Sequence, residues 1–401
     1  MENELQAKKI AQTAKSAALK LRTLSAEIRN NALRKIAASL RLKQAEIIRE
    51  NEKDIAAAQA SGMSASMLDR LTLNPKRIED MAVGVEEIAA FADPLGKVLE
   101  HRALANGIDL SRISVPLGAI FFIYESRPNV TIDGAALCFK AGNAVILRGG
   151  KESVHSSSCL ANIFSETIAE FGVSKDAVQY INNPDRDLLA CLLKSDCLDL
   201  VIPRGGEGLI RAVSEQSKIP VIKHFNGICH VYVDKSADLN KAAEILYNAK
   251  VQRPSVCNAA ETVLFHKDLP KESVELVLKP LKEAGVEFHY DKCGIEYLDL
   301  QISVCFVSNV QEACEHIEKN GSHHTEAIVA EDAEALEFFA NNVDSSSVML
   351  NASTRFADGG QYGLGAEVGI STDKLHARGP MGVESLCSYK WLLKGSGQVR
   401  K

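Results

Sequence analysis

Residues 111–125 read SRISVPLGAIFFIYE, and this apolar, β-rich stretch is the first of a series that decides the fold. Further β-rich stretches follow it, and helical segments separate them. The β-rich stretches are 143–149, 198–205, 220–225 and 229–234, and the helical segments include 153–172 and 238–251. Strands that alternate with helices form parallel sheets, so the sequence predicts an α/β protein.

A second alternating block follows Cys257 and is long enough for a second α/β domain. Its apolar stretches are 262–266, 300–308 and 326–332, and its helical segments are 272–285, 311–321 and 333–342. Before the first block, residues 2–62 have apolar positions every three or four residues, which predicts a helical region. Residues 352–382 are Gly-rich and irregular, and 385–401 predict a strand with a frayed end.

The composition excludes several classes of protein. Among 401 residues, 46% are hydrophobic and 24% are charged, which excludes global disorder. The net charge is −6 and no basic block is present, so we expect no nucleic-acid partner. The longest apolar run without a charge, 113–124, is shorter than the roughly 20 residues of a membrane helix. The first twenty residues have no apolar signal segment, which predicts a cytoplasmic protein. Ten scattered cysteines are expected to be reduced thiols.

Two positions stand out for acyl chemistry. Cys257 lies after a helical run and just before an apolar strand, where a thiol can project into a cleft. Asn129 follows Pro128 on an expected turn, where a rigid amide can donate to a developing oxyanion. Each has a plainer alternative, since a cysteine is often a buried structural thiol and an asparagine often stabilises a turn.

Basic residues end one of the predicted strands. Arg148 and Lys151 lie at the carboxyl end of 143–149, the edge where α/β sheets bind ligands. The alternative is a pair of solvated surface cations.

Other patterns resemble nucleotide-binding or metal-binding motifs but lack the sequence context that such motifs require. Residues 363–369, GLGAEVG, follow no predicted strand, and 148–153, RGGKES, lack the first glycine of a phosphate loop. The cysteines and histidines do not show a zinc-binding spacing, so no metal is expected. The pairs considered are His323 with His324, Cys191 with Cys197, and Cys229 with His230.

Several stretches together resemble the aldehyde dehydrogenase superfamily, and within it the branch that reduces an acyl phosphate of glutamate. The stretches cover nearly the whole chain: 124–131, 141–152, 202–206, 252–262, 297–300, 321–329 and the unusual 351–380. The resemblance implies an atypical Rossmann-like cofactor domain, an α/β catalytic domain and a small β-flap that builds a homo-oligomer. It assigns 1–105 and 119–226 to the cofactor domain, 227–380 to the catalytic domain, and 106–118 with 381–401 to the flap.

The resemblance also implies a reaction. Cys257 would attack γ-glutamyl phosphate, release phosphate and form a thioester, while Asn129 and the Cys257 backbone N–H bind the oxyanion. Hydride from NADPH would then give glutamate 5-semialdehyde, the second step of proline synthesis from glutamate. The chain has no kinase portion, so a separate glutamate 5-kinase would supply the substrate.

Further residues take roles by resemblance. Arg148, Lys151, Gly205, Gly206 and Glu296 would bind the cofactor. Lys151 replaces the acidic residue of NAD-binding relatives, which favours the 2′-phosphate of NADPH. If the alignment is shifted by one residue, Glu152 takes this place and the preference for NADPH loses its support.

The substrate carries a carboxylate and a phosphate, so cationic groups are expected around it. The candidates are Arg127, Arg253, Ser353 and Arg355, with interdomain salt bridges as the alternative for the arginines.

One substitution bears on the type of reaction. His224 occupies the place of the general-base glutamate of hydrolytic relatives, which would protect a thioester from water. His224 itself could transfer a proton or be structural. A hydrolytic, NAD-linked dehydrogenase and a catalytically silent scaffold remain the alternatives.

Overall fold

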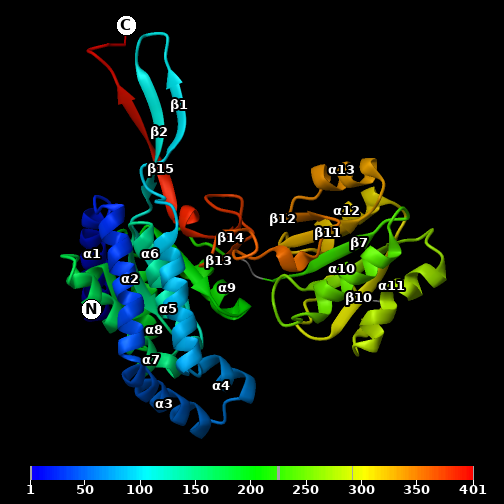
Figure 1. The fold of residues 1–401 in the computed structure, drawn as a ribbon, viewed down its shortest axis with the longest axis horizontal. Coiled ribbons are helices and arrows are strands. Elements are labelled where there is room, and N and C mark those ends of the chain that lie inside the picture. The colour runs from blue at the N-terminus through cyan, green and yellow to red at the C-terminus, as the bar shows by residue number, and fades with distance from the viewer. Residues whose placement is uncertain (1, 224–225, 291, 401) are drawn as a thin grey trace. The chain divides into compact units, whose positions relative to one another are not determined.

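The computed structural model describes residues 2–223, 226–290 and 292–400, and His224 lies outside this part of the chain. Contacts divide the chain into two compact units, which Figure 1 shows with their elements labelled. Unit 1 spans Met1–Ile222, Leu364–Gly369 and Met381–Lys401, and unit 2 spans Lys223–Gly363 and Ile370–Pro380. The first boundary lies four residues before the one predicted at 226/227. None of the described helices is both long and apolar enough to cross a membrane.

The core of unit 1 is a four-stranded parallel sheet with the order β5-β4-β3-β6. Its strands are β3 (Ala119–Tyr124), β4 (Ala144–Arg148), β5 (Val178–Tyr180) and β6 (Leu200–Arg204). The helices that follow them are α6 (Asn129–Lys140), α7 (Val154–Ala169), α8 (Arg186–Leu192) and α9 (Glu207–Gln216), with short 3₁₀ turns at Lys151–Ser153 and Lys175–Ala177. Every residue of β3 is buried, as expected for a central parallel strand.

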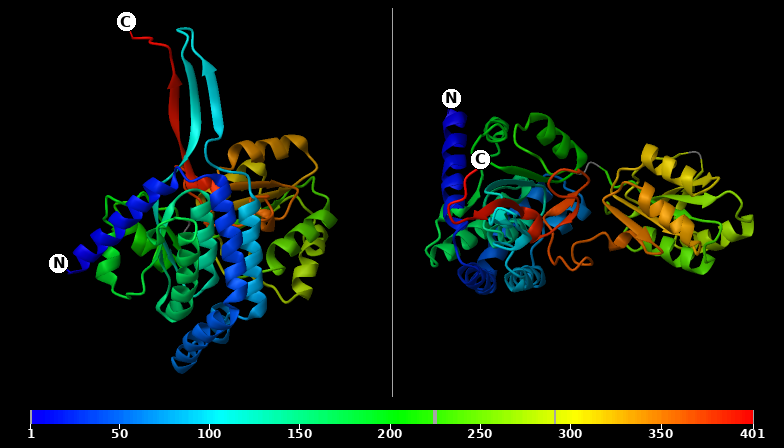
Figure 2. Two further views of the ribbon diagram at one scale, coloured as in Figure 1. Left: turned by 60° about the vertical axis from the view of Figure 1, so that its left-hand side comes forward. Right: turned by 90° about the horizontal axis from the view of Figure 1, so that it is seen from above.

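Five helices form the N-terminal part of unit 1, and the apolar spacing correctly predicted the first three. They are α1 (Glu2–Leu21), α2 (Ala26–Leu42), α3 (Gln44–Ala60), α4 (Ala65–Leu71) and α5 (Pro75–Ala90). In α2, Ser25 caps the first turn by accepting the N–H of Ile28, and Leu33, Ile36 and Leu40 form the buried face. Figure 2 shows this helical layer beside the sheet of unit 1.

A three-stranded antiparallel sheet extends from unit 1 (Figure 1). It consists of β1 (Val98–Ala103), β2 (Asp109–Pro116) and β15 (Cys387–Lys394), which follows a 3₁₀ turn at Val383–Leu386. The resemblance placed 98–103 in the cofactor domain, but these residues pair with β2 across a short turn and therefore belong to the flap. Strands β1 and β15 have several exposed residues, whereas most residues of β2 are partly buried.

The stretch 111–125 is two strands in different sheets, and Gly118 explains the break. Its φ is +133°, and a Cβ there would overlap the carboxylate of Asp199. That carboxylate accepts the N–H of Ala119, the first residue of β3. Only glycine fits this close approach, so the chain turns out of the flap and into the parallel sheet.

Unit 2 has a six-stranded parallel sheet in the order β12-β11-β7-β8-β10-β9. The strands are β7 (Cys229–Val233), β8 (Ala260–His266), β9 (Glu287–His289), β10 (Gln301–Val307), β11 (Thr325–Val329) and β12 (Ser347–Leu350). The helices are α10 (Leu239–Val251), α11 (Lys271–Glu283), α12 (Val310–Asn320) and α13 (Ala333–Asn342). One apolar cluster includes residues of α10 and α11, and a second includes residues of α12 and α13, so helices cover both faces.

Two local predictions are wrong. Residues 220–223 form no strand, because only Val221 bridges to Val201 of β6 and Pro220 has no N–H to donate. The structure joins Cys293 and Cys305 by a disulfide, whereas reduced thiols were expected. The segment 351–380 is mostly irregular, as predicted, with a 3₁₀ turn at Thr354–Phe356 and the short pair β13 (Gly369–Ser371) and β14 (Gly379–Met381).

A buried ion pair in unit 2 gives a test of the fold. Lys250 Nζ lies 2.8 Å from Glu261 Oε2, and both side chains are fully buried. Glu261→Gln leaves the Lys250 cation without its counter-ion, so we expect the free energy of unfolding to fall by about 3–5 kcal/mol in urea titrations. Glu331→Gln is the matched control, since its pair with Lys241 is exposed and worth about 0–1 kcal/mol. Equal losses in the two variants would contradict the prediction.

Candidate active site

Cys257 lies in the turn between α10 and β8, as predicted, and is half-buried. A neighbouring thiol, Cys229, donates to the Cys257 carbonyl oxygen at 3.2 Å. Burial, reinforced by the negative charge of Glu326, raises the pKa of Cys229 well above its usual value. Cys229 is therefore kept as a protonated thiol, and the more accessible Cys257 is the better candidate for a nucleophile.

A close backbone contact supports the Cys257 turn. A Cβ at Gly227 would overlap the carbonyl group of Cys257, so only glycine allows this approach. The N–H of Gly227 donates to Glu296 Oε1 at 2.7 Å. Glu296 was predicted to bind the cofactor, and the structure shows that its carboxylate also fixes the segment packed against Cys257.

The loop at residues 351–358 is hydrogen-bonded to Asn258, the residue that follows Cys257. The Thr354 hydroxyl donates to the Asn258 carbonyl at 2.7 Å, and Asn258 Nδ2 donates to the Ala357 carbonyl at 2.9 Å. Arg355 donates to the Asn258 side-chain oxygen and, through Nε, to Gln252 at 2.8 Å. No sequence pattern predicts that Asn258 holds this loop by hydrogen bonds.

Arg355 interacts with charges of both signs, the cation of Arg253 and the carboxylate of Asp358. Burial and repulsion from Arg253 lower the pKa of Arg355, which remains a cation at neutral pH. The guanidinium groups of Arg253 and Arg355 repel each other near Cys257, and an anionic ligand between them would be favoured. Ser353 has a structural contact instead, since its hydroxyl accepts the N–H of Arg355 and caps the 3₁₀ turn.

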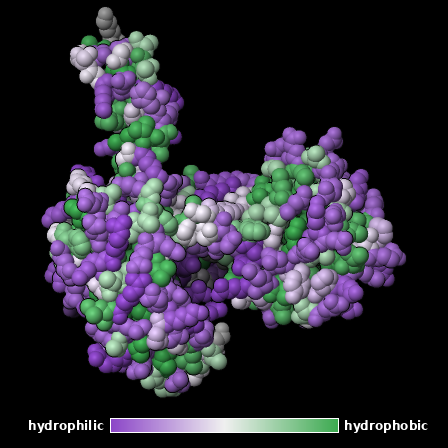
Figure 3. Space-filling model, viewed as in Figure 1, coloured by the Kyte–Doolittle hydropathy of each residue, from purple (hydrophilic) through white to green (hydrophobic). Residues whose placement is uncertain are grey.

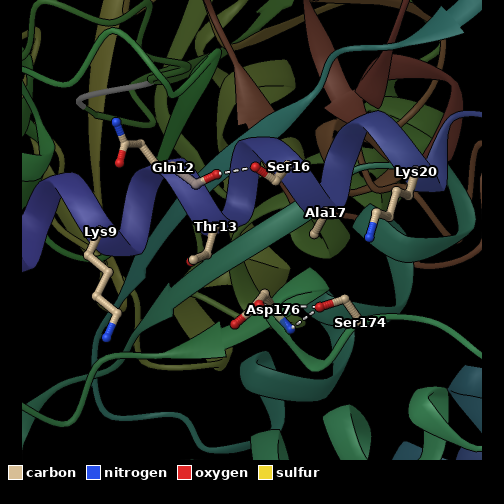
Figure 4. Close-up of a pocket in the computed structure, with 8 residues that line it drawn as sticks. All are labelled: Lys9, Gln12, Thr13, Ser16, Ala17, Lys20, Ser174 and Asp176. Atoms are coloured by element: carbon tan, nitrogen blue, oxygen red, sulfur yellow. Dashed lines mark hydrogen bonds between the residues drawn. The ribbon is translucent and has the colours of Figure 1, made fainter.

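Two cavities help to delimit the site. One, of about 320 Å³, is lined by Arg355 with Asn248, Gln252, Phe356, Asp358 and Gln361. Another, of about 220 Å³, lies in unit 1 between α1 and the turn at Ser174 and Asp176 (Figure 4). None of the predicted site residues lines this second cavity, so we do not include it in the site.

In unit 1, the predicted residues gather at the carboxyl edge of the parallel sheet. Asn129 begins α6 after β3 and does not lie on an isolated turn as predicted, because the backbone becomes helical directly after Pro128. Its Nδ2 donates to Asp133 Oδ2 at 3.0 Å, one turn further along α6. Burial raises the pKa of Asp133 to about 6, against the opposing effects of Asn129 and Arg204. Arg127, two residues before Asn129, is exposed.

The other predicted cofactor residues follow β4 and β6. Arg148 ends β4 and donates to the Pro184 carbonyl at 3.1 Å, while Lys151 is exposed on the 3₁₀ turn after it. Glu152 instead accepts hydrogen bonds from the N–H and hydroxyl of Ser126. These contacts leave Lys151, not Glu152, open to an anionic ligand.

Two glycines follow β6 at the start of α9. The N–H of Gly206 donates to Glu125 Oε2 at 2.9 Å, and a Cβ at Gly205 would overlap the same carboxylate. A carboxylate at a helix N-terminus marks a place suited to anions.

The structure thus gathers the predicted residues into two groups, one in each unit. Arg127, Asn129, Arg148, Lys151, Gly205 and Gly206 follow the strands of unit 1, and Arg253, Cys257, Glu296, Ser353 and Arg355 belong to unit 2. Sequence reasoning missed Asp133, Gly227, Cys229 and Asn258, which act through contacts on the predicted residues.

The chain belongs to the aldehyde dehydrogenase family, because the model of that family matches residues 1–292. Two of its curated relatives are named gamma-glutamyl phosphate reductase. The one from Idiomarina loihiensis is 48% identical and covers 98% of this chain and 99% of its own. The one from Paramagnetospirillum magneticum is 46% identical and covers 98% and 96%.

Solved structures agree with this assignment. The crystal structure of gamma-glutamyl phosphate reductase from Thermotoga maritima has a TM-score of 0.96 at 39% identity and covers 98% of this chain and 99% of its own. An acetylating aldehyde dehydrogenase from Geobacillus thermoglucosidasius, 17% identical with a TM-score of 0.70, covers 100% of this chain and 98% of its own and shares the fold. The predicted fold class and the predicted resemblance are confirmed.

The contact between Asn129 and Asp133 leads to a kinetic prediction. Asp133→Ala removes the acceptor that orients the Asn129 amide, so kcat is expected to fall roughly tenfold, or about 1.4 kcal/mol. Asp133→Asn keeps an oxygen acceptor and should retain most of kcat. Initial rates of semialdehyde oxidation, with KM for NADP⁺ measured in parallel, test both variants. An equal loss in Asp133→Asn would show that the acceptor oxygen is not what matters.

Proposed function

We propose that this protein catalyses the NADPH-dependent reduction of γ-glutamyl phosphate to glutamate 5-semialdehyde with release of phosphate, the second step of proline synthesis from glutamate. The observation that carries the proposal is the half-buried Cys257 on a fastened turn beside two arginines. Full-length relatives named gamma-glutamyl phosphate reductase support the choice of substrate over a hydrolytic aldehyde dehydrogenase.

The reaction begins at the Cys257 thiolate, which forms a bond to the acyl carbon of γ-glutamyl phosphate. The carbon–oxygen bond to the phosphate breaks, and phosphate leaves with the electron pair. The Cys257 backbone N–H and the Asn129 amide donate to the carbonyl oxygen as negative charge develops on it. The product of this half-reaction is a thioester on Cys257.

Reduction of the thioester requires a hydride, which a nicotinamide cofactor supplies when bound. The Cys257 thiolate then departs from the tetrahedral adduct and the semialdehyde is released. A carboxylate general base would direct water to the thioester. We infer that His224, at that place in the sequence, does not activate water as a glutamate does.

The donor set of unit 1 fits an anionic dinucleotide. Arg148 and Lys151 lie at and just beyond the carboxyl end of β4, and Gly205 and Gly206 allow close approach to the start of α9. We assign the 2′-phosphate of NADPH to Lys151, since Glu152 is engaged with Ser126. Glu296 in unit 2 would hold the nicotinamide ribose.

For the substrate, we assign anion recognition to Arg253 and Arg355, whose mutual repulsion an anion would relieve. Arg127 is a further candidate for the phosphate group. Ser353 would contribute indirectly, because its hydroxyl caps the turn that presents Arg355.

We also propose that the flap builds a homo-oligomer, with unit 1 as the cofactor domain and unit 2 as the catalytic domain. The flap strand β15 exposes Tyr389, Trp391, Leu392 and Leu393, and Figure 3 shows apolar side chains along the flap. Such residues would be covered by a second copy. We further infer a cytoplasmic location and a separate glutamate 5-kinase that supplies the labile substrate.

The proposed function is tested by running the reaction backwards. Wild-type protein given glutamate 5-semialdehyde and NADP⁺ is expected to form NADPH only when phosphate is present. Cys257→Ala should lower this rate on the order of 10³-fold or more, since the covalent step is lost. Cys191→Ala, which removes another partly exposed thiol, is the control and should leave the rate unchanged. Phosphate-independent turnover would mean that water resolves the thioester.

Cofactor preference tests the role of Lys151. Lys151→Ala removes a charge-assisted contact worth about 1.5–3 kcal/mol, so KM for NADP⁺ should rise roughly 10- to 100-fold while KM for NAD⁺ changes little. The exposed Lys175 on another turn of unit 1 provides the control Lys175→Ala. A parallel rise for both cofactors in Lys151→Ala would argue against recognition of the 2′-phosphate.

A further inference from the structure

Three metal-ligating side chains converge in unit 2, apart from the proposed active-site groups. The sulfur atoms of Cys293 and Cys305 and a ring nitrogen of His316 lie within 4.8 Å of one another. Cys293 lies in the loop between β9 and β10, Cys305 on β10, and His316 on α12. Because the three come from three elements, the fold itself brings them together.

The local structure explains this convergence. Cys305 belongs to the apolar cluster between the sheet and α12, where Ala313 and Ile317 also lie. The loop after Cys293 turns at Gly294, whose φ is +73° and whose Cβ would lie 3.3 Å from the carbonyl oxygen of Asn320. This close approach places the loop against the end of α12, one turn beyond His316.

The imidazole of His316 is suited to be a ligand. Within the described chain, its Nε2 is buried and has no hydrogen-bond partner.

The neighbouring His230 makes the same region polar. Its ring centroid is 5.5 Å from that of His316, and its Nδ1 is 2.9 Å from Glu326 Oε2. His230 is fully buried, and its Nε2 likewise has no partner among the described residues. Two buried imidazole nitrogens in one region, each without a partner among the described residues, are polar groups that call for a ligand.

The structure joins Cys293 and Cys305 through their sulfur atoms, but the backbone spacing of the pair is wide for a disulfide. The Cα atoms of Cys293 and Cys305 are 7.4 Å apart, beyond the usual disulfide range of about 4.4–6.8 Å. Around zinc, bonds of about 2.3 Å to sulfur and 2.0–2.1 Å to nitrogen place tetrahedral ligand atoms about 3.5–3.8 Å apart. The three ligand atoms lie within 4.8 Å of one another, and the two sulfur atoms are joined in the structure, so they must be reduced and separate to reach this arrangement.

We propose that the reduced protein binds one zinc ion through Cys293, Cys305 and His316, with a water molecule as fourth ligand on the side of the exposed Cys293. A phosphine or thiol reductant supplies the two electrons that cleave the sulfur–sulfur bond, and two protons complete the thiols. Both thiols lose their protons to solvent as zinc binds, so the ion is held by two thiolates and one neutral imidazole.

Such a site would link the loop that carries Glu296 to β10 and α12. Glu296 follows Cys293 by three residues, and its carboxylate holds the N–H of Gly227, which packs against Cys257. Zinc would thus tie α12 and β10 to the segment behind the nucleophile. The role is structural and is independent of the proposed reaction, so metal content can be tested without an activity assay.

The test measures zinc in the full-length chain. Protein reduced with a phosphine, exposed to zinc and then freed of excess ion is analysed by inductively coupled plasma mass spectrometry. We expect about one zinc per chain in the wild type and loss of that zinc in Cys293→Ser. Cys293 is exposed, so this change should not prevent folding, which circular dichroism checks. Cys314→Ser alters a buried thiol on α12 and should keep the metal.

Cobalt provides a second readout. Cobalt(II) in place of zinc should show sulfur-to-metal charge-transfer absorption in the wild type, weakened in Cys293→Ser and shifted in His316→Gln. Absence of bound metal in folded, reduced wild type would overturn the proposal. So would equal zinc in Cys293→Ser, or alkylation of only eight of the ten cysteines after reduction, which would indicate a persistent disulfide.

Discussion

The close contact between the backbones of Gly227 and Cys257 is the constraint on which the candidate site in unit 2 depends. A side chain at Gly227 would overlap the Cys257 carbonyl, so the segment before β7 and the turn before β8 can approach this closely only with glycine at that position. Hydrogen bonds hold both segments in place. The Glu296 carboxylate accepts the Gly227 N–H, and the Cys229 thiol donates to the Cys257 carbonyl. The backbone of Cys257, the proposed nucleophile, is therefore positioned by packing and hydrogen bonds of its neighbours.

The sequence predicted those parts of the site that follow from the order of elements along the chain. Alternation of strands and helices places Arg148 at the end of β4, Lys151 just after it and Cys257 before β8, and the parallel sheets put each at a defined edge. The same reasoning failed for Asn129, because Pro128 precedes a helix as readily as it occupies a turn.

Other features depend on contacts between residues far apart in the sequence. Asn258 and Arg355 are 97 residues apart, and no period or motif links them. The break at Gly118 follows from the position of Asp199, not from the neighbouring residues, so the sequence alone predicts one β-rich stretch over 111–125. The cluster at His316 has the same origin: its ligands lie on a loop, a strand and a helix, and their spacing matches no zinc-binding pattern.

At the start of α9, a carboxylate of the chain and an anionic ligand would compete for the same backbone N–H. Glu125 accepts the Gly206 N–H, a donor that a pyrophosphate at this helix would also use. One N–H cannot serve both anions fully, so a dinucleotide that reaches Gly206 must displace the carboxylate. When the Glu125 carboxylate moves away, its charge-assisted hydrogen bond to the Gly206 N–H is lost. Contacts between the dinucleotide phosphates and cationic side chains must offset this loss. Arg148 and Lys151 are cations of unit 1 at the carboxyl end of β4, which β3 separates from β6, the strand that leads into α9. They therefore lie at the same edge of the parallel sheet as the start of α9.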